Sequence, residues 1–278
     1  MKLLHLFSFL LITATVATRA DETADAGRKI LAQNQDAIVT LKAVLKISGS
    51  AGGNAINQQE QRVELTGTVV DPSGLTIVSY TMIDPSSAAK SQIRRMLAQH
   101  GKSTSDVDIR SEVTSAKLVL GDGTEIPATI VLRDEDLDLA FFRPTTKPAK
   151  PLAAIAITPV STPQMLDQVY LLNRLSNVAK RTVAVTLGRI DAVVQKPRLF
   201  YSVGAAVTGS PLGGPSFTPD GKLVGFSLIR KNANSEDDDV VSGPGSQGGL
   251  MPVVVPASDL ADGIKQALSV PVKTEEKK

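Results

Sequence analysis

Short β-rich runs separated by turn residues recur along most of the chain, and this spacing constrains the fold more than any other sequence feature. Val, Ile, Leu and Thr dominate the runs, and Pro, Gly, Asp or Asn occupies the intervals. Many short strands with regular turns favour an all-β barrel or sandwich. The runs that we expect to be strands are residues 37–47, 63–70, 75–80, 116–120, 126–132, 137–142, 169–172, 182–194, 199–207, 222–230 and 251–255.

The two ends of this β-rich region favour helices, and one interval within it favours a loop. Residues 21–35 form a short predicted helix with Ile30 and Leu31 on its apolar face, and residues 257–268 form a predicted closing helix. Residues 48–59 are rich in Gly, Asn and Gln, which predicts a loop between the first two strands.

A third helix is predicted as an insertion over residues 85–100. Asp84 can cap its start, Pro85 suits the first helical position, and Gly101 suits the C-terminal cap. We expect this helix on the outside of the β-structure, with its apolar residues facing inward. The residues that share its apolar face are Ile93, Met96, Leu97 and His100.

The first 20 residues have the features of a secretory signal peptide. Lys2 provides the basic start, residues 3–17 the apolar run, and residues 18–20 a cleavage site that ends in a small residue. A retained membrane anchor is the alternative that the sequence leaves open. The interpretation as a signal peptide predicts a periplasmic or secreted protein, with no transmembrane span after the signal is removed.

The rest of the chain is expected to divide into one domain and a tail. We expect the domain over residues 21–268, with its halves meeting near residues 144–160, where a connector rich in Pro and Lys begins. Residues 269–278 form a charged tail that we expect to be disordered.

Composition excludes several classes of function. The chain has no cysteine, which excludes disulfides, thiolate metal sites and a lipid-modified cysteine. Loss of residues 1–20 would remove Lys2 and Arg19 and leave 28 basic and 28 acidic residues. Tryptophan is absent, and the few aromatic residues are not interleaved with basic clusters, so we expect no nucleic-acid partner.

The segment Gly-Ser-Pro-Leu-Gly-Gly-Pro-Ser, residues 209–216, lies between two expected strands and carries the most specific motif of the chain. It resembles the nucleophile loop of trypsin-like serine proteases of the HtrA/Deg branch, whose pattern is Gly-Asn-Ser-Gly-Gly-Pro. The Gly-Gly-Pro is present. The position that holds the nucleophilic serine in that family holds Leu212 here.

Other segments extend the resemblance in the family's order, over roughly residues 26–268. Residues 66–74, Thr-Gly-Thr-Val-Val-Asp-Pro-Ser-Gly, resemble the opening Gly-Ser-Gly-Val-Val-Val-Asp-x-x-Gly. The next nine residues lie over Tyr-Ile-Val-Thr-Asn-Asn-His-Val-Val, which puts Thr81 at the catalytic histidine position. Residues 133–140 resemble Asp-x-x-x-Asp-Leu-Ala, which puts Asp138 at the aspartate position. Two further segments, residues 118–126 and 252–255, resemble a hairpin and the closing strand.

This resemblance implies a trypsin-like double β-barrel with an inserted helix, a C-terminal helix and the three triad-equivalent positions at the junction of the barrels. It also implies that catalysis is lost, because Leu212 has no nucleophile and Thr81 cannot act as a base near neutral pH. We therefore expect no catalytic residue at Thr81, Asp138 or Leu212. The mechanism of this family uses no cofactor or metal, and we expect none.

Two residues are candidates to replace the missing triad members, Ser210 as the nucleophile and His100 as the base. Ser210 becomes a spare nucleophile if Pro211 and Leu212 are an insertion, but it still lacks a histidine partner. After signal removal His100 is the remaining histidine, and its place at the end of a predicted helix favours a structural role. The expected oxyanion donors are the amides of Ser210 and Leu212, and the family has glycine at the first of these positions.

Two acidic features have alternative interpretations. Asp138 is either a buried remnant that needs the Thr81 hydroxyl or backbone amides as donors, or a surface residue at the start of a strand. The run of acids at residues 236–239 lacks the spacing of a known calcium loop, which favours a solvated loop.

Three functions remain open on sequence grounds. The leading hypothesis is an exported, catalytically inactive HtrA-like homologue that binds peptide or protein ligands, by strand addition or within an envelope complex. The second is an active, atypical serine endopeptidase that uses Ser210. The third is a structural partner of an active envelope protease of the same family.

Overall fold

The computed structural model describes residues 22–204, 212–231 and 250–272. The expected signal peptide, the end of the strand expected at 199–207, Ser210, Pro211, the acidic run at 236–239 and most of the expected tail lie outside these ranges. None of the helices in the described ranges is both long and apolar enough to cross a bilayer.

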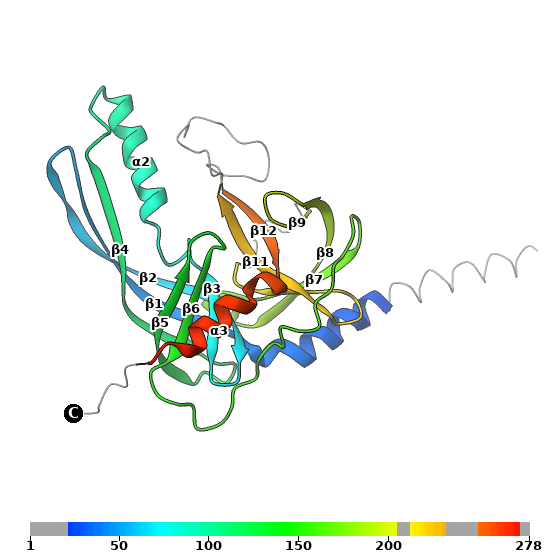
Figure 1. The fold of residues 1–278 in the computed structure, drawn as a ribbon. Coiled ribbons are helices and arrows are strands. Elements are labelled where there is room, and N and C mark those ends of the chain that lie inside the picture. Colours follow the sequence, from blue (N-terminus) through cyan, green and yellow to red (C-terminus); the bar gives the residue numbers. More distant parts are fainter. Residues whose placement is uncertain (1–21, 205–211, 232–249, 273–278) are drawn as a thin grey trace, which may run out of the picture.

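Two closed six-stranded antiparallel barrels make up the fold, which confirms the expected trypsin-like double β-barrel (Figure 1). The strand order is β1-β2-β3-β6-β5-β4 in the first barrel and β10-β11-β12-β9-β8-β7 in the second. The first contains β1 (Ile38–Ala51), β2 (Asn54–Asp71), β3 (Leu75–Ser79), β4 (Val107–Val119), β5 (Glu125–Asp134) and β6 (Leu139–Pro144). The second contains β7 (Gln168–Arg174), β8 (Val183–Val194), β9 (Phe200–Val203), β10 (Pro215–Phe217), β11 (Leu223–Lys231) and β12 (Leu250–Pro256).

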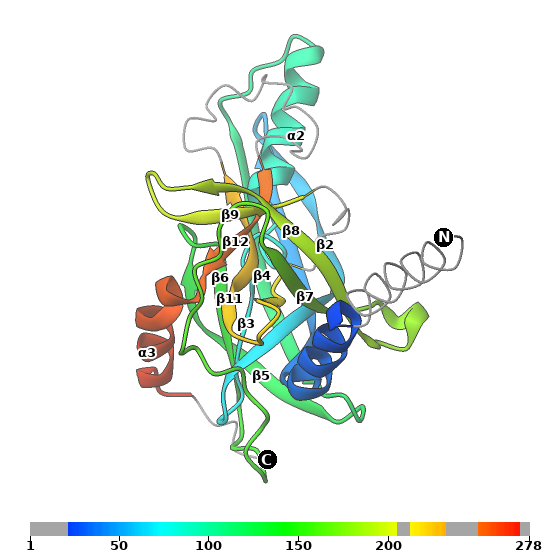
Figure 2. The same ribbon diagram turned by 90° about the vertical axis from the view of Figure 1, so that its right-hand side faces the viewer.

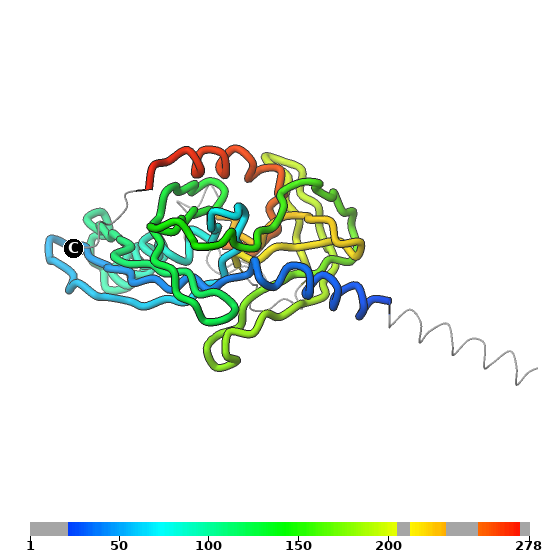
Figure 3. Tube along the Cα trace, turned by 90° about the horizontal axis from the view of Figure 1, so that it is seen from below, coloured from blue at the N-terminus to red at the C-terminus, as the bar shows by residue number. Residues whose placement is uncertain are grey.

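The helices expected at the two ends are present. A helix over residues 22–34 runs into the 3-10 turn η1 (Gln35–Ala37), and η3 (Ala257–Leu260) leads into α3 (Ala261–Ser269). These two helices lie on opposite sides of the barrels (Figures 2 and 3). A third 3-10 turn, η2 (Asn177–Ala179), precedes β8.

A shared hydrophobic core joins the two barrels and both terminal helices. Ile30, which is 1% exposed, packs from the first helix, and Ile264 packs from α3. Phe141 from the first barrel and Phe226 from the second lie in the same cluster, and neither is exposed. Because apolar residues of both barrels are buried together, the junction between them is a continuous part of the core.

The loop predicted over residues 48–59 is wrong, because β1 and β2 continue through it as a hairpin. Ala51 pairs with Asn54, and the chain turns at Gly52 and Gly53, which have φ values of 56° and 78°. Glycine adopts positive φ readily, and a Gly-Gly pair is a preferred hairpin turn. The other edge of β1 pairs with β4 as far as Val107, so backbone pairing on both edges outweighs the weak hydrophobic pattern.

The inserted helix is present as α2 (Ser86–Gln99), and Gly101 ends it with a φ of 64°. α2 begins one residue later than predicted, with Pro85 rather than Asp84 at the N-cap position. The Asp84 carboxylate, one residue before the cap, accepts a 3.1 Å hydrogen bond from the Ser86 amide. The predicted inward packing is wrong, because no residue of α2 is buried and Met96 is 52% exposed.

α2 has no buried residue because it packs at the projecting end of the first barrel. The distal halves of β1, β2 and β4 extend beyond the barrel, and α2 lies beside them (Figure 1). α2 contacts β4, so it packs on a thin sheet with little apolar surface to cover. Sequence periodicity identifies which face of a helix is apolar, but it does not measure how much surface that face meets.

Candidate functional site

Asp138 is a deeply buried charged residue, with 1% of its surface exposed. It lies immediately before β6 with a φ of 59°, in the left-handed region that Asp tolerates better than most residues. The alternative that placed Asp138 at the surface is therefore wrong, and its carboxylate needs donors inside the protein.

Three donors reach the Asp138 carboxylate. The Thr81 amide donates to Oδ1 over 2.7 Å, and the Ser79 hydroxyl donates to Oδ2 over 2.6 Å. The Ile229 amide, from β11 of the second barrel, also donates to Oδ2 over 2.7 Å. Backbone amides thus supply two of the three donors, as expected, and Ser79 is a donor that sequence analysis missed.

Thr81 lies directly after β3, and its amide rather than its side chain engages Asp138. The Thr81 Oγ1 atom is buried and has no hydrogen-bond partner. The Asp138 carbonyl in turn accepts a 2.8 Å hydrogen bond from the Tyr80 amide. Thr81 and Asp138 are therefore side by side, but no imidazole connects them to a nucleophile.

Leu212 begins the described part of the Gly-Gly-Pro loop, and the residues after it are fixed against the first barrel. Gly213 has a φ of 87°, its amide donates to the Ser227 carbonyl over 2.7 Å, and its carbonyl accepts from the Thr68 hydroxyl over 2.7 Å. A Cβ atom at Gly213 would lie 2.3 Å from the Thr66 carbonyl oxygen, which explains why this position needs glycine.

A cleft of about 270 Å³ opens beside Leu212 at the junction of the barrels. Residues from β1, β2 and the segment after β3 form one wall, and residues at the end of β7 form the other. Met82 and Leu175 present exposed apolar surface there, 40% and 39% respectively. The lining residues are Thr40, Glu64, Leu65, Thr66, Met82, Asn173, Arg174, Leu175, Ser176 and Leu212.

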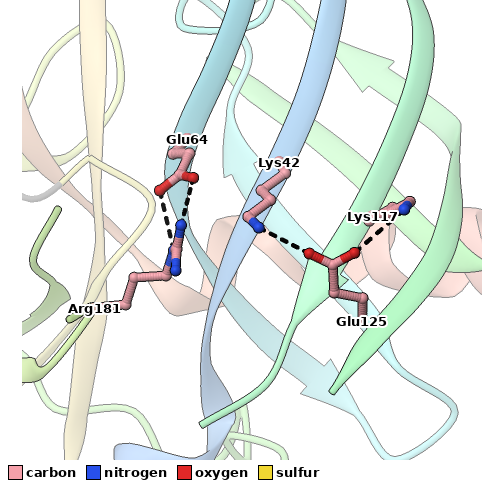
Figure 4. Close-up of polar contacts among 5 residues, drawn as sticks. All are labelled: Lys42, Glu64, Lys117, Glu125 and Arg181. Carbon is pink, nitrogen blue, oxygen red and sulfur yellow. Dashed lines mark hydrogen bonds and ion pairs between the residues drawn. The ribbon is translucent and has the colours of Figure 1, made fainter. Parts of the chain in front are cut away.

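Charged residues of the cleft are held by both barrels. Arg181 binds the Glu64 carboxylate through two nitrogens, with Nη2–Oε1 at 2.6 Å and Nε–Oε2 at 3.1 Å (Figure 4). The hydrogen bond to Glu64 raises the pKa of Arg181. Arg174 donates from Nε to the Ile38 carbonyl over 2.7 Å and from Nη1 to the Arg181 carbonyl over 3.0 Å.

Burial lowers the pKa of Arg174, but a guanidinium remains charged at neutral pH. The cleft therefore combines a fixed cation and a neutralised carboxylate with apolar side chains.

A second ion-paired group lies on the outer surface of the first barrel, where Glu125 binds Lys42 and Lys117 (Figure 4). Hydrogen bonds from these two lysines, with that from Lys42 the larger effect, lower the pKa of Glu125.

The other candidate residues lie elsewhere or outside the described ranges. His100 is exposed at the end of α2, with Nδ1 2.7 Å from the Met96 carbonyl oxygen. Ser210, whose amide is one of the two expected oxyanion donors, lies outside the described residues. Among the residues that the structure does describe, no three His, Cys, Asp or Glu side chains gather as metal ligands do.

Sequence analysis missed the residues that the second barrel contributes to the cleft. Arg174 ends β7, an ordinary hydrophobic strand, and Leu175 follows it. No motif marks either residue. Ile229 donates through its backbone, so its residue type carries no signal. Ser79 had one available signal, its position two residues before Thr81 on a buried strand, where a hydroxyl needs an acceptor.

A family model described as a trypsin-like peptidase domain matches residues 65–226, a span that includes Thr81, Asp138 and Leu212. No curated protein matches the chain.

Proposed function

We propose, since the chain belongs to the trypsin-like peptidase domain family, that it is a catalytically inactive member of the HtrA branch that binds extended peptide segments. We further propose that residues 1–20 export it and that it acts in the periplasm or outside the cell. The peptide or unfolded protein segment would bind in the cleft beside Leu212.

The observation that carries the proposal is that the donors to the Asp138 carboxylate in the described structure include no imidazole. In an active triad the aspartate holds an imidazole, which takes the proton from the serine. Here the Ser79 hydroxyl and the amides of Thr81 and Ile229 satisfy that carboxylate. With Thr81 and Leu212 at the other two positions, the chain has neither the base nor the nucleophile of the mechanism.

Two features of the cleft support peptide binding. Met82, Leu175 and Leu212 provide apolar contact, and polar side chains surround them. Glu64, Leu65 and Thr66 lie on β2, whose strand partners in the described structure are β1 along residues 54–68 and β3 from Thr68 onward. Among the described residues, no strand pairs with the outer edge of β2 before Thr68, although Gly213 covers it at the Thr66 carbonyl. An extended peptide can pair with the open part of such an edge.

Binding of a fluorescent, unfolded casein derivative, followed by anisotropy, tests the cleft. Met82→Asp and Leu175→Asp each place a charge in the apolar part of the cleft. We expect each to weaken binding at least about tenfold, because a buried, unpaired carboxylate is costly. Val178→Asp is the matched control, since Val178 is 98% exposed and does not line the cleft.

The same samples test catalysis. We expect no cleavage of the casein and no labelling by a fluorophosphonate probe. Equal binding by the Met82, Leu175 and Val178 variants would refute the cleft as the binding site. Cleavage that Ser210→Ala abolishes would replace this proposal with the active endopeptidase that uses Ser210.

A further inference from the structure

The segment from Pro85 to Ser105 carries basic side chains and no acidic side chain that could balance their charge. Its 21 residues contain four basic side chains, no acidic side chain and no aromatic one. The basic residues are Lys90, Arg94, Arg95 and Lys102. The rest of the described chain mixes both signs of charge, so this concentration of one sign is a distinct feature of the surface.

No ion pair in the described structure includes any of these four residues. Three acids flank the segment: Asp84 and Asp108 have other partners, and the exposed Asp106 forms no ion pair with the four basic residues in the described structure. Asp84 accepts hydrogen bonds from the Tyr80 hydroxyl at 2.6 Å and from the Ser86 amide. Asp108 pairs with Arg110 at 2.8 Å. Within residues 22–204, 212–231 and 250–272, no acidic side chain therefore forms an ion pair with the basic residues of this segment.

α2 presents this charge at an outer end of the protein. It lies at the projecting end of the first barrel in two perpendicular views (Figures 1 and 2). Arg94, Arg95 and Met96 are consecutive exposed residues. Each residue of a helix turns by about 100°, so these three side chains fan across the side of α2 that is turned away from β4.

We propose that α2 is a docking surface for an anionic membrane, with Lys90, Arg94, Arg95 and Lys102 contacting lipid headgroups and Met96 reaching the boundary with the acyl chains. Arg94 and Arg95 are exposed on α2, Lys90 is half-exposed on it, and Lys102 is exposed just after it; each basic residue near an anionic surface contributes about 1 kcal/mol of attraction. Charge complementarity is the argument for this occupant. The proposal is independent of what binds in the cleft beside Leu212.

A membrane fits the shape and composition of α2 better than other anionic partners. The residues of this segment line neither the cleft beside Leu212 nor a second cleft next to α3. The absence of aromatic residues removes the stacking platforms that single-stranded nucleic acids use. A planar, anionic surface needs neither feature.

Vesicle co-sedimentation of the purified protein tests the proposal. We expect at least about tenfold more binding to vesicles of phosphatidylcholine with 30 mol% phosphatidylglycerol than to phosphatidylcholine alone, since each basic residue contributes about a fivefold increase in binding. Binding should fall steeply as salt rises from about 0.1 M to 0.5 M, because salt screens charges at the surface. Arg94→Glu with Arg95→Glu should lower binding at least about tenfold.

The control variant is Lys147→Glu with Lys150→Glu, which makes the same change in net charge at two exposed lysines in the connector between the barrels. We expect it to bind as the unmodified protein does. The proposal is overturned if binding ignores phosphatidylglycerol, if the α2 variant binds normally, or if the control variant loses as much binding. Capture of an acidic protein by α2, without vesicle binding, would replace the membrane as its partner.

Discussion

The Ile229 amide of the second barrel donates a 2.7 Å hydrogen bond to the Asp138 carboxylate of the first. This contact joins β11 to the start of β6 at a position that is 1% exposed. We propose that Asp138 stands at the position of the triad aspartate. Its carboxylate accepts hydrogen bonds from both barrels and so ties them together.

Removal of the Asp138 carboxylate should destabilise the protein strongly. Asp138→Ala leaves the Ser79 hydroxyl and the amides of Thr81 and Ile229 without an acceptor, and we expect a loss of about 3–5 kcal/mol in the free energy of unfolding. Urea denaturation measures it. Asp136→Ala, at an exposed carboxylate two residues away, should stay within about 0.5 kcal/mol. Equal losses in the two variants would show that the carboxylate of Asp138 is not a structural link.

Gly213 and Gly123 form a matched pair for the Gly-Gly-Pro loop, because both have a φ of 87°. A Cβ atom at Gly213 would lie 2.3 Å from the Thr66 carbonyl oxygen, whereas nothing lies within 4 Å of one at Gly123. Gly123→Ala therefore has only the cost of positive φ, about 1–2 kcal/mol. Gly213→Ala adds the clash and should lose at least about 1 kcal/mol more in urea denaturation. Equal losses would mean that the loop moves away freely.

The sequence predicted the barrels well because their signal is local and repeated. Alternating apolar residues and turn residues placed the strands. Between β4 and β5, for example, the turn residues Asp122 and Gly123 lie in a loop where the Asp122 carboxylate accepts from the Thr124 amide at 2.9 Å. It failed at residues 48–59, where a strand is exposed on both faces and has no alternation to detect. Pairing with β1 decides that structure, and pairing partners distant in sequence are not visible in a local pattern.

The site was predictable only where a motif exists. Thr81, Asp138 and Leu212 came from a resemblance to a known order of segments. The donors to Asp138 include Ser79 and the backbone of Ile229, which is 91 residues away in sequence. Backbone donors depend on the fold alone, so any residue type serves, and no sequence pattern records them.

Leu97→Ala should affect stability only slightly. Truncation of a fully buried leucine costs about 2–5 kcal/mol, which is the range that an inward-facing α2 would give. Leu97 is only partly buried, so we now expect less than about 1.5 kcal/mol in urea denaturation. Leu118→Ala, in the core of the first barrel with 0% exposed, should show the full loss. A loss above 2 kcal/mol at Leu97 would mean that α2 packs more tightly than the structure shows.

Asp220 should contribute to stability at neutral pH and lose that contribution in acid. Hydrogen bonds from the Lys222 and Thr218 side chains, with that from Lys222 the larger effect, lower the pKa of Asp220 to about 2. A carboxyl with a lowered folded-state pKa stabilises the fold above its unfolded value of about 3.9, and the effect disappears as pH falls toward 2. The stability difference between the unmodified protein and Asp220→Asn should therefore be constant above about pH 5 and shrink below about pH 4. A difference that does not depend on pH would contradict this assignment.

Restoration of the triad should require more than its two missing members. Thr81→His or Leu212→Ser alone should give no cleavage of fluorogenic casein, because triad members act as a unit. The double variant should give little activity, for two reasons. The Ile229 and Ser79 donors already occupy Oδ2 of Asp138, and Ser210-Pro211 stands where the family has Gly-Asn. Proline fixes its φ near −65°, and loss of one oxyanion donor removes about 2.7–4 kcal/mol of transition-state stabilisation.

Addition of Ser210→Gly and Pro211→Asn to the double variant should therefore raise its activity, with labelling by a fluorophosphonate probe rising in parallel. The control replaces Leu212→Ser by Leu212→Ala in the same background and should be inactive. If the double variant alone were as active as the quadruple variant, the loop before Leu212 would already hold its amides in the active arrangement. The two changed triad positions would then be enough to explain the inactivity that we propose.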